Sequence, residues 1–227
     1  MQRPGALLID FGGTLAAEAA SRAELYAEAG RRHGADVRAD AMEHLMREAH
    51  DSLPVVHEGA FRYSHRWFER FIELIFGERL GMSSEALDAT RQDLFARFSD
   101  AATFRVFPGS RELIGAARRS GAPVALVSNW SDALPALVRD LGLEFDAILC
   151  SAIERSEKPE AAIFERALER VGTRARDAIH VGDSIANDVE GARAVGIESV
   201  LVDRRGRRAD FEGRRVRRLD ELVALFD

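Results

Sequence analysis

Five polar residues of this chain stand where short apolar runs end or helix-like segments begin. Asp10 directly follows the run ALLI, Asp183 follows DAIHVG, and Ser128 ends PVALVS. Lys158 and Asp188 each lie near the start of a helix-like segment. Carboxylate oxygens suit Mg²⁺, while an ammonium and a hydroxyl can hold the oxygens of a phosphoryl group. These residue types together could carry out metal-assisted attack on a phosphate ester.

Lys158 is the single lysine among the 32 basic residues of the chain. Such a bias favours arginine wherever positive charge alone is sufficient. A lysine that persists against this bias marks a place where a compact ammonium is needed, because the planar guanidinium of arginine cannot replace it.

The remaining pattern predicts the elements that would bring these residues together. Strands are expected at 6–11, 123–128, 146–151, 177–182 and 198–202, with helices at 110–119, 132–141, 160–171, 187–195 and 220–226. This alternation predicts an α/β fold with a doubly wound parallel sheet and helices on both faces. Ligands of such sheets bind beyond the carboxyl ends of the strands, so we expect the five polar residues at one edge.

A long helical stretch interrupts this alternation. Residues 16–32 are compatible with a helix, and no strand pattern appears from there to about residue 99. Apolar residues recur at three- and four-residue spacing near 40–51, 61–76 and 84–98. We therefore expect an all-helical domain, residues 16–104, inserted into a core domain made of residues 1–15 and 105–227.

Composition restricts the partners. The net charge of −6 argues against nucleic acid, and the eight arginines between Arg204 and Arg218 are read as a solvated face. No apolar run is long enough to cross a membrane and no signal-peptide pattern is present, so we expect a cytoplasmic protein. The single cysteine, Cys150, ends the apolar run DAILC and is expected in the core, with a catalytic thiol as the open alternative. The expected partner is a small phosphorylated molecule, and the sequence carries no signal of oligomeric state.

Four ordered segments carry a family resemblance. They are DFGGTL at 10–15, VSN at 127–129, KP at 158–159 and GDSIAND at 182–188. Together they resemble the four motifs of the haloacid dehalogenase superfamily. The helical insertion resembles the C1 cap of its subfamily I, and FPG at 107–109 resembles the usual return to the core.

This resemblance implies a Mg²⁺-dependent phosphatase of a small phosphorylated metabolite. Asp10 would be the nucleophile, forming an aspartyl-phosphate, and Lys158 the catalytic cation that neutralises it. The implied metal ligands are Asp10, the carbonyl group of Gly12, Asp183 and Asp188. The implied phosphate-binding residues are Phe11, Gly12, Gly13, Thr14, Ser128, Asn129 and Lys158.

One position departs from the family pattern. Phosphatases of this family have a second aspartate two residues after the nucleophile, as general acid and then base, but here the residue is Gly12. General acid–base catalysis contributes about 10²–10⁴-fold, so we expect slow turnover of alkyl phosphates and a persistent aspartyl-phosphate. His57, Glu58 or His65 could supply a substitute acid, although surface positions are favoured for them. His180 is expected to be a core histidine.

Two other functions stay open at this point. The chain could bind a phosphate or a partner without turnover, having lost the acid at Gly12. It could also dehalogenate a 2-haloacid, since a halide leaves without a proton, but Asp183 and Asp188 together favour a cation site.

Overall fold

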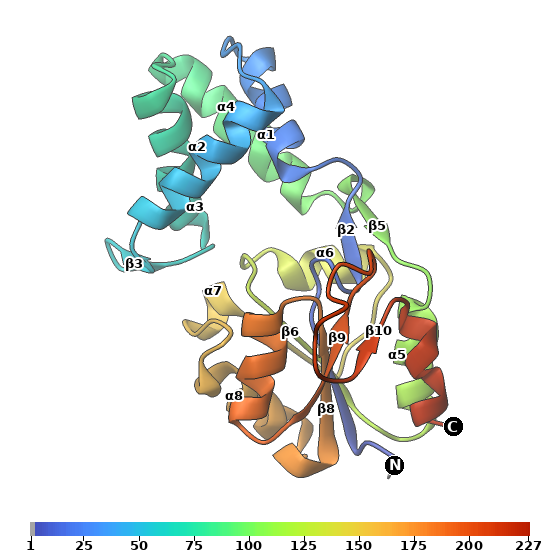
Figure 1. The fold of residues 1–227 in the computed structure, drawn as a ribbon. Helices are drawn as coiled ribbons and strands as arrows, with labels where there is room; N and C mark the ends of the chain where they lie inside the picture. The colour runs from blue at the N-terminus through green and yellow to red at the C-terminus, as the bar shows by residue number, and fades with distance from the viewer. Residues whose placement is uncertain (1–2) are drawn as a thin grey trace.

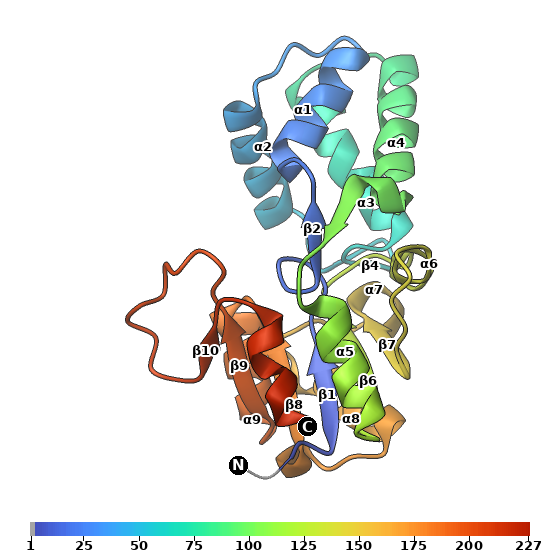
Figure 2. The same ribbon diagram turned by 90° about the vertical axis from the view of Figure 1, so that its right-hand side faces the viewer.

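A six-stranded parallel sheet forms one half of the molecule (Figures 1 and 2). The computed structural model describes residues 3–227. The strand order is β10-β9-β8-β1-β6-β7. The strands are β1 Ala6–Ile9, β6 Val124–Ser128, β7 Ala147–Cys150, β8 Ala178–Gly182, β9 Glu198–Val202 and β10 Arg215–Val216. The predicted α/β class with a parallel sheet is therefore confirmed.

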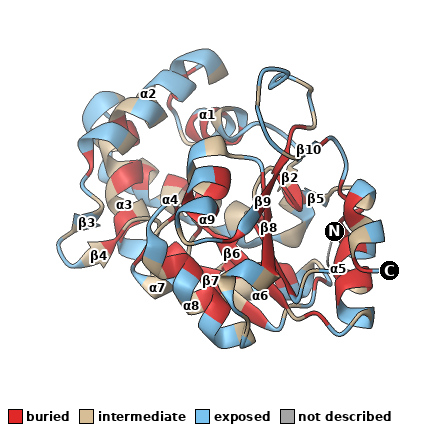
Figure 3. Cartoon of the chain, turned by 60° about the horizontal axis from the view of Figure 1, so that its bottom comes forward, coloured by how far each residue is buried: buried red, intermediate tan, exposed pale blue. Residues whose placement is uncertain are grey.

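Both faces of this sheet are covered. In β1, Leu7 and Ile9 pack into one apolar cluster, while Ala6 and Leu8 pack into another. Successive strand residues point to opposite faces, so each face has its own layer of helices. The first layer contains α5 (Ser110–Arg119), α6 (Leu134–Asp140) and the 3₁₀-helix Leu219–Leu225; the second contains α8 (Ala161–Val171) and α9 (Gly191–Ala194). Figure 3 shows the buried strands enclosed by half-exposed helices.

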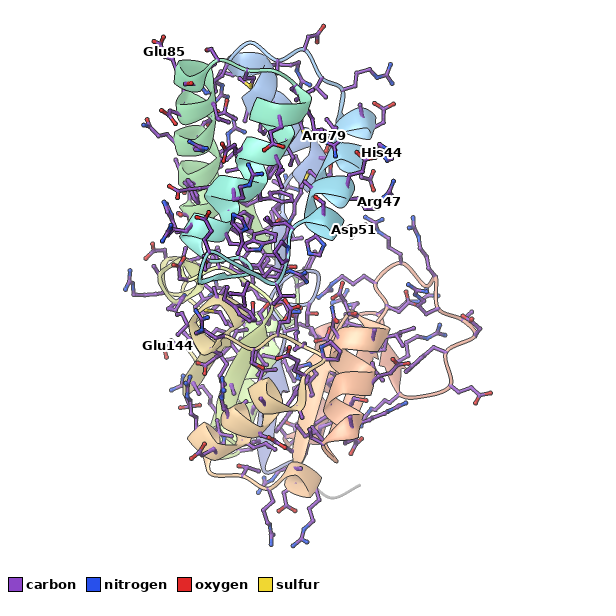
Figure 4. The ribbon with its side chains drawn as sticks, turned by 90° about the vertical axis from the view of Figure 1, so that its left-hand side faces the viewer. His44, Arg47, Asp51, Arg79, Glu85 and Glu144 are labelled. Atoms are coloured by element: carbon purple, nitrogen blue, oxygen red, sulfur yellow. The ribbon has the colours of Figure 1, made fainter. Side chains whose placement is uncertain are left out.

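Four helices form the other half of the molecule. They are α1 Arg22–Arg32, α2 Ala39–Ser52, α3 His65–Ile72, continued by the π-helix Glu73–Arg79, and α4 Ser84–Ser99. They enclose a separate core that includes Met42, Trp67 and Phe76. The outer side of α2 is polar, as His44 and Asp51 show in Figure 4. We call this helical half the cap.

The segment 16–104 is not wholly helical, which corrects the sequence-based expectation. Strands β2 (Ala16–Glu18) and β5 (Phe104–Val106) form an antiparallel ribbon where the chain leaves and re-enters the core. A second hairpin joins β3 (Val56–His57) to β4 (Ala60–Phe61). These strands have only two or three residues, too few for a period-2 pattern, and pairing satisfies their backbone groups where two connections run side by side.

The remaining helical pieces are short. They are α7 Ser151–Glu154, the 3₁₀-helices Ala101–Thr103 and Ala175–Asp177, and the π-helix Ile185–Glu190. The helix expected at 187–195 is thus a π-turn followed by α9, and the helix expected at 220–226 is 3₁₀. Within residues 3–227 no helix combines the length and apolarity that a membrane span requires.

Candidate active site

The carboxyl ends of three adjacent strands gather the acidic residues. Asp10 follows β1, Ser128 ends β6, and Asp183 follows β8. Asp188 reaches the same place from the π-helix behind β8. Oxygens of Asp10, Asp183 and Asp188 lie within 4.8 Å of one another. The structure thus brings together three of the residues expected at this edge of the sheet.

Lys158 joins two of these carboxylates. Its Nζ lies 2.7 Å from Oδ1 of Asp10 and 2.5 Å from Oδ1 of Asp188. Ser128 Oγ donates a third hydrogen bond to Asp10, at 2.8 Å to the same Oδ1. All four side chains are buried. One oxygen of Asp10 is therefore fixed, and its Oδ2 accepts no hydrogen bond from the described residues.

Electrostatics distinguishes the two carboxylates that share Lys158. Burial and nearby Asp188 raise the pKa of Asp10, although Lys158 opposes the shift. Despite burial, Lys158 and His180 hold the pKa of Asp188 below its ordinary value. Burial also opposes the charge on Lys158, but Asp10 and Asp188 outweigh it and raise its pKa. An ammonium between two carboxylates is therefore the stable arrangement.

Asp183 is the exposed member of the acidic set. Partial loss of solvent around its carboxyl group, together with the charges of Asp10 and Asp188, raises its pKa to about 7. Three carboxylates face one ammonium here, so the site has an excess of negative charge. Hard oxygen donors with uncompensated charge fit a small divalent cation such as Mg²⁺.

Two glycines allow this close packing. Gly13 has a φ of 79°, and a Cβ placed on it would lie 2.3 Å from Oδ2 of Asp183. A Cβ on Gly182 would lie 2.1 Å from Cγ of Asp188. Any other residue at these positions would displace an acidic side chain.

Asn129 anchors the lysine and does not point at the acidic set. Its Nδ2 donates to the carbonyl of Lys158 at 2.9 Å, and its Oδ1 accepts from the N–H of Lys158 at 2.7 Å. We expected Asn129 to assist in phosphoryl binding, but here both ends of its amide hold the lysine backbone.

Asp188 is held from behind by two further groups. Nε2 of the fully buried His180 lies 2.9 Å from Oδ1 of Asp188, and the Ser184 N–H donates to Oδ2 at 3.0 Å. Because Asp188 is ionised, Nε2 must carry the proton. His180 is in the core as expected, but it also orients an acidic site residue, which a lone histidine in a strand pattern does not reveal.

Arg204 supports the turn after Asp10. Its guanidinium donates to the carbonyls of Gly13 and Thr14 and lies 3.8 Å from the ring centre of Phe107. The same turn is closed by N–H donation from Thr14 and Leu15 to the carbonyl of Phe11, while the side chains of Phe11 and Thr14 are fully buried. The expectation of a solvated basic stretch is therefore wrong for Arg204.

Trp130 is a site residue that the sequence analysis missed. A Cβ on Gly12 would lie 2.9 Å from Cζ3 of Trp130, so the indole occupies the space next to the glycine. The indole packs edge-on against Phe11, with ring centres 5.0 Å apart. The only available signal was its place directly after Asn129 at a strand end.

The candidate substitute acids are not equally placed. His57 and Glu58 line a polar surface depression together with Arg66, and the acidic residues are not among those that line it. His65 begins α3 and stacks on Phe95, with ring centres 4.0 Å apart. Cys150 is buried at the end of β7.

An open parallel sheet with a helical cap and an acidic cluster at its carboxyl edge defines a class of capped α/β hydrolases. Comparison with family models agrees, since residues 4–196 match the model of the haloacid dehalogenase-like hydrolases. The chain belongs to this family, which confirms the resemblance drawn from its four motifs.

Similar proteins include phosphatases. The chain is 31% identical over 183 residues to haloacid dehalogenase-like hydrolase domain-containing protein 3 of Bos taurus, covering 78% of this chain and 73% of that one. It is 31% identical over 166 residues to a phosphoserine phosphatase of Thermus thermophilus, covering 70% and 66%. A HAD phosphatase structure from Thermococcus onnurineus superposes with a TM-score of 0.69 at 25% identity, covering 99% and 97%. A defluorinating L-2-haloacid dehalogenase, 20% identical, shares the fold with a TM-score of 0.76 over 100% and 98%.

Proposed function

We propose that this hydrolase is a Mg²⁺-dependent phosphatase of a small phosphorylated molecule, with Asp10 as its nucleophile. The observation that carries the proposal is the buried bridge from Lys158 to Asp10 and Asp188, with Asp183 alongside. Phosphoserine and ribulose-1,5-bisphosphate phosphatases among the similar proteins support a phosphoester substrate.

The protein groups have separate tasks in this proposal. Lys158 and Ser128 hold Oδ1 of Asp10, so Oδ2 is left to attack phosphorus. The ammonium also lowers the repulsion between an anionic nucleophile and an anionic ester. Asn129 fixes the backbone of Lys158 and keeps the ammonium in place.

Asp10, Asp183, Asp188 and the carbonyl of Gly12 would hold the metal. When bound, Mg²⁺ supplies positive charge that screens the nucleophile from the phosphate and polarises a phosphoryl oxygen. His180 and Ser184 keep Asp188 turned towards the site. Partners of this kind around a metal ligand typically affect metal affinity by about 10–100-fold.

A paired substitution tests the nucleophile. We expect the protein to release phosphate from 4-nitrophenyl phosphate only with Mg²⁺, and Asp10→Asn to reduce release to the uncatalysed level. Asp36→Asn, an exposed aspartate between α1 and α2, is the matched control and should keep full activity. Asp10→Asn that retains turnover overturns the assignment.

The same preparations separate the two alternatives. A non-catalytic binder would gain thermal stability from Mg²⁺ and phosphate without forming product. A dehalogenase would release chloride from 2-chloropropionate without Mg²⁺. The excess negative charge around Asp183 disfavours that reaction, because without a cation an anionic haloacid would face three carboxylates and a single ammonium.

A further inference from the structure

A cavity of about 380 Å³ lies between the cap and the sheet. Both tryptophans and both tyrosines of the chain line it, together with several phenylalanines. We call it the aromatic cavity and define it by Tyr26, Tyr63, Trp67, Phe68, Phe95 and Trp130. Figure 4 shows the side chains crowded at this level between the cap helices and the sheet. Its size suits one or two fused rings.

The cavity adjoins the acidic site. Asn129 and Trp130 line it on the core side. Asn129 is bonded to Lys158, and the indole of Trp130 packs against Gly12, two residues after Asp10. A phosphate placed at Asp10 would therefore carry its organic group towards the aromatic cavity.

The polar groups around the cavity are largely engaged. The Arg22 guanidinium is paired with Glu18 at 2.6 Å and lies 4.8 Å from the centre of the Trp130 ring. His50 faces Tyr63, and burial together with the charge of Arg62 lowers the pKa of its ring, although Asp51 opposes the shift. Ser131 and Asp132 are among the few lining side chains left to pair with the hydroxyl or ammonium groups of a sugar or an amino acid. An aromatic ring needs no such partners and would lose only apolar contact with water.

A second, independent observation concerns the proton that a leaving group needs. Residue 12 has no side chain, and Trp130 fills the adjacent space. Other titratable side chains line the cavity, and none of them hydrogen-bonds to Asp10 or to the ammonium of Lys158 in the described structure; they are Arg22, Tyr26, Arg47, His50, Tyr63, His65 and Asp132. A phenol ionises with a pKa of about 10, against about 16 for an alcohol that resembles water. An aryl oxygen can therefore leave unprotonated, while an alkyl oxygen cannot.

We infer that the substrate is a phosphate monoester of a planar aromatic alcohol, with its ring held between Trp130 and the aromatic side chains of the cap. This inference rests on the proposed phosphatase function. Asp10 Oδ2 forms a bond to phosphorus as the P–O(aryl) bond breaks, and the electron pair leaves with the aryl oxygen, which later takes a proton from water. A water molecule then attacks phosphorus and loses one proton to solvent while the bond between phosphorus and Oδ2 of Asp10 breaks, which releases inorganic phosphate and the Asp10 carboxylate.

Three probe esters distinguish a preference for aromatic substrates from phosphatase activity in general. 1-Naphthyl phosphate has a ring and a good leaving group, cyclohexyl phosphate has a ring-sized alkyl group, and acetyl phosphate has a good leaving group without a ring. With Mg²⁺, we expect KM for 1-naphthyl phosphate to be about tenfold below that for acetyl phosphate. We expect kcat/KM for cyclohexyl phosphate to be at least about 100-fold below that for 1-naphthyl phosphate, because kcat/KM reports the step that expels the leaving group.

Each contrary result has a distinct meaning. Equal KM values for 1-naphthyl and acetyl phosphate overturn the aromatic subsite and leave the phosphatase intact. Equal kcat/KM values for cyclohexyl and 1-naphthyl phosphate overturn the requirement for an aryl leaving group. Failure to cleave any of the three overturns the proposed function itself.

Two further measurements fix the location of the ring. Phe68→Leu should raise KM for 1-naphthyl phosphate about threefold to tenfold and lower its selectivity over acetyl phosphate. Phe145 packs against the core and does not line the cavity, so Phe145→Leu is the control and should leave that selectivity unchanged. If Phe68→Leu does not fold, phenylphosphonate binding to the native protein still decides. Phenylphosphonate should quench tryptophan fluorescence at a concentration about tenfold below the concentration that methylphosphonate requires. Equal affinities for the two phosphonates overturn the ring subsite.

Discussion

The indole of Trp130 lies against Gly12, with Cζ3 2.9 Å from where a Cβ on that glycine would be. Gly12→Asp alone should therefore displace the ring and give no gain on alkyl phosphates. Gly12→Asp combined with Trp130→Leu makes room for the carboxyl group and should raise turnover of cyclohexyl phosphate by at least about tenfold over Gly12→Asp. Trp130→Leu alone is the control, and an equal gain in it would assign the effect to space and not to the acid.

The lack of a side chain at Gly12 also affects the second half of the reaction. Without a general base near Asp10, attack of water on the aspartyl-phosphate should be slower than its formation. Rapid mixing with 4-nitrophenyl phosphate should then give a burst of nitrophenol approaching one equivalent per enzyme, followed by a slow steady rate. A linear time course from the first turnover would contradict this order of rates.

Arg204 links the loop after β9 to the turn that carries Asp10. Arg204→Gln removes the donors to the carbonyls of Gly13 and Thr14, so we expect a loss of about 2 kcal/mol in the free energy of unfolding and a lower kcat. Arg205→Gln, at the exposed neighbour, should change neither. The measurements are urea denaturation and phosphate release. Equal effects of the two substitutions would show that Arg204 acts only as a surface charge.

The sequence predicts the parallel sheet well because β1, β6, β7, β8 and β9 are short apolar runs between helical segments, and the pattern required no long-range information. It also predicts the convergence of Asp10, Ser128 and Asp183, since carboxyl ends of neighbouring parallel strands meet at one edge. Strands of two or three residues, such as β3, could not be predicted in this way. They are too short to show an alternating pattern and form because they pair with a neighbouring strand.

Contacts between segments that are distant in the chain could not be predicted from the sequence. Trp130 and Gly12 are 118 positions apart in the sequence, as are Ser128 and Asp10, yet each pair is in contact. Arg204 was one of eight arginines in a polar stretch, and its role depends on carbonyls 190 and 191 positions away. Motif resemblance identified residues with a shared type and order, but not these chain-specific partners.

Burial raises the pKa of the Cys150 thiol to about 11, from an ordinary value of 9.0. The native protein should therefore react with a thiol reagent at pH 8 on the order of 100-fold more slowly than the urea-unfolded chain. In the folded protein the Cys150 thiol keeps its proton to a higher pH than in the unfolded chain. The stability that this protonated thiol contributes is therefore complete below pH 9 and is lost as the pH rises through 11. Cys150→Ala should remove that part of the pH dependence of unfolding, and an unchanged slope would contradict the shift.

An ion pair connects the cap to the core. Arg62, next to β4, lies 3.0 Å from Glu157, which directly precedes Lys158, and the two side chains are only 17% and 14% exposed. Burial raises the pKa of Glu157 and Arg62 opposes that shift. Arg62→Gln leaves the carboxylate buried without its partner, so it should destabilise the protein and lower kcat/KM by loosening the cap over the site.

A double-mutant cycle with Glu157→Gln tests this coupling directly. The double variant Arg62→Gln/Glu157→Gln should lose about 1 kcal/mol less free energy of unfolding than the sum of the two single variants, because it has no unpaired buried carboxylate. Arg66→Gln is the matched control, since its partner Glu58 is 3.7 Å away and both side chains are at least 70% exposed. Such an exposed pair contributes little. Strict additivity of Arg62→Gln and Glu157→Gln in both stability and kcat/KM would mean that this contact does not hold the cap to the loop of Lys158.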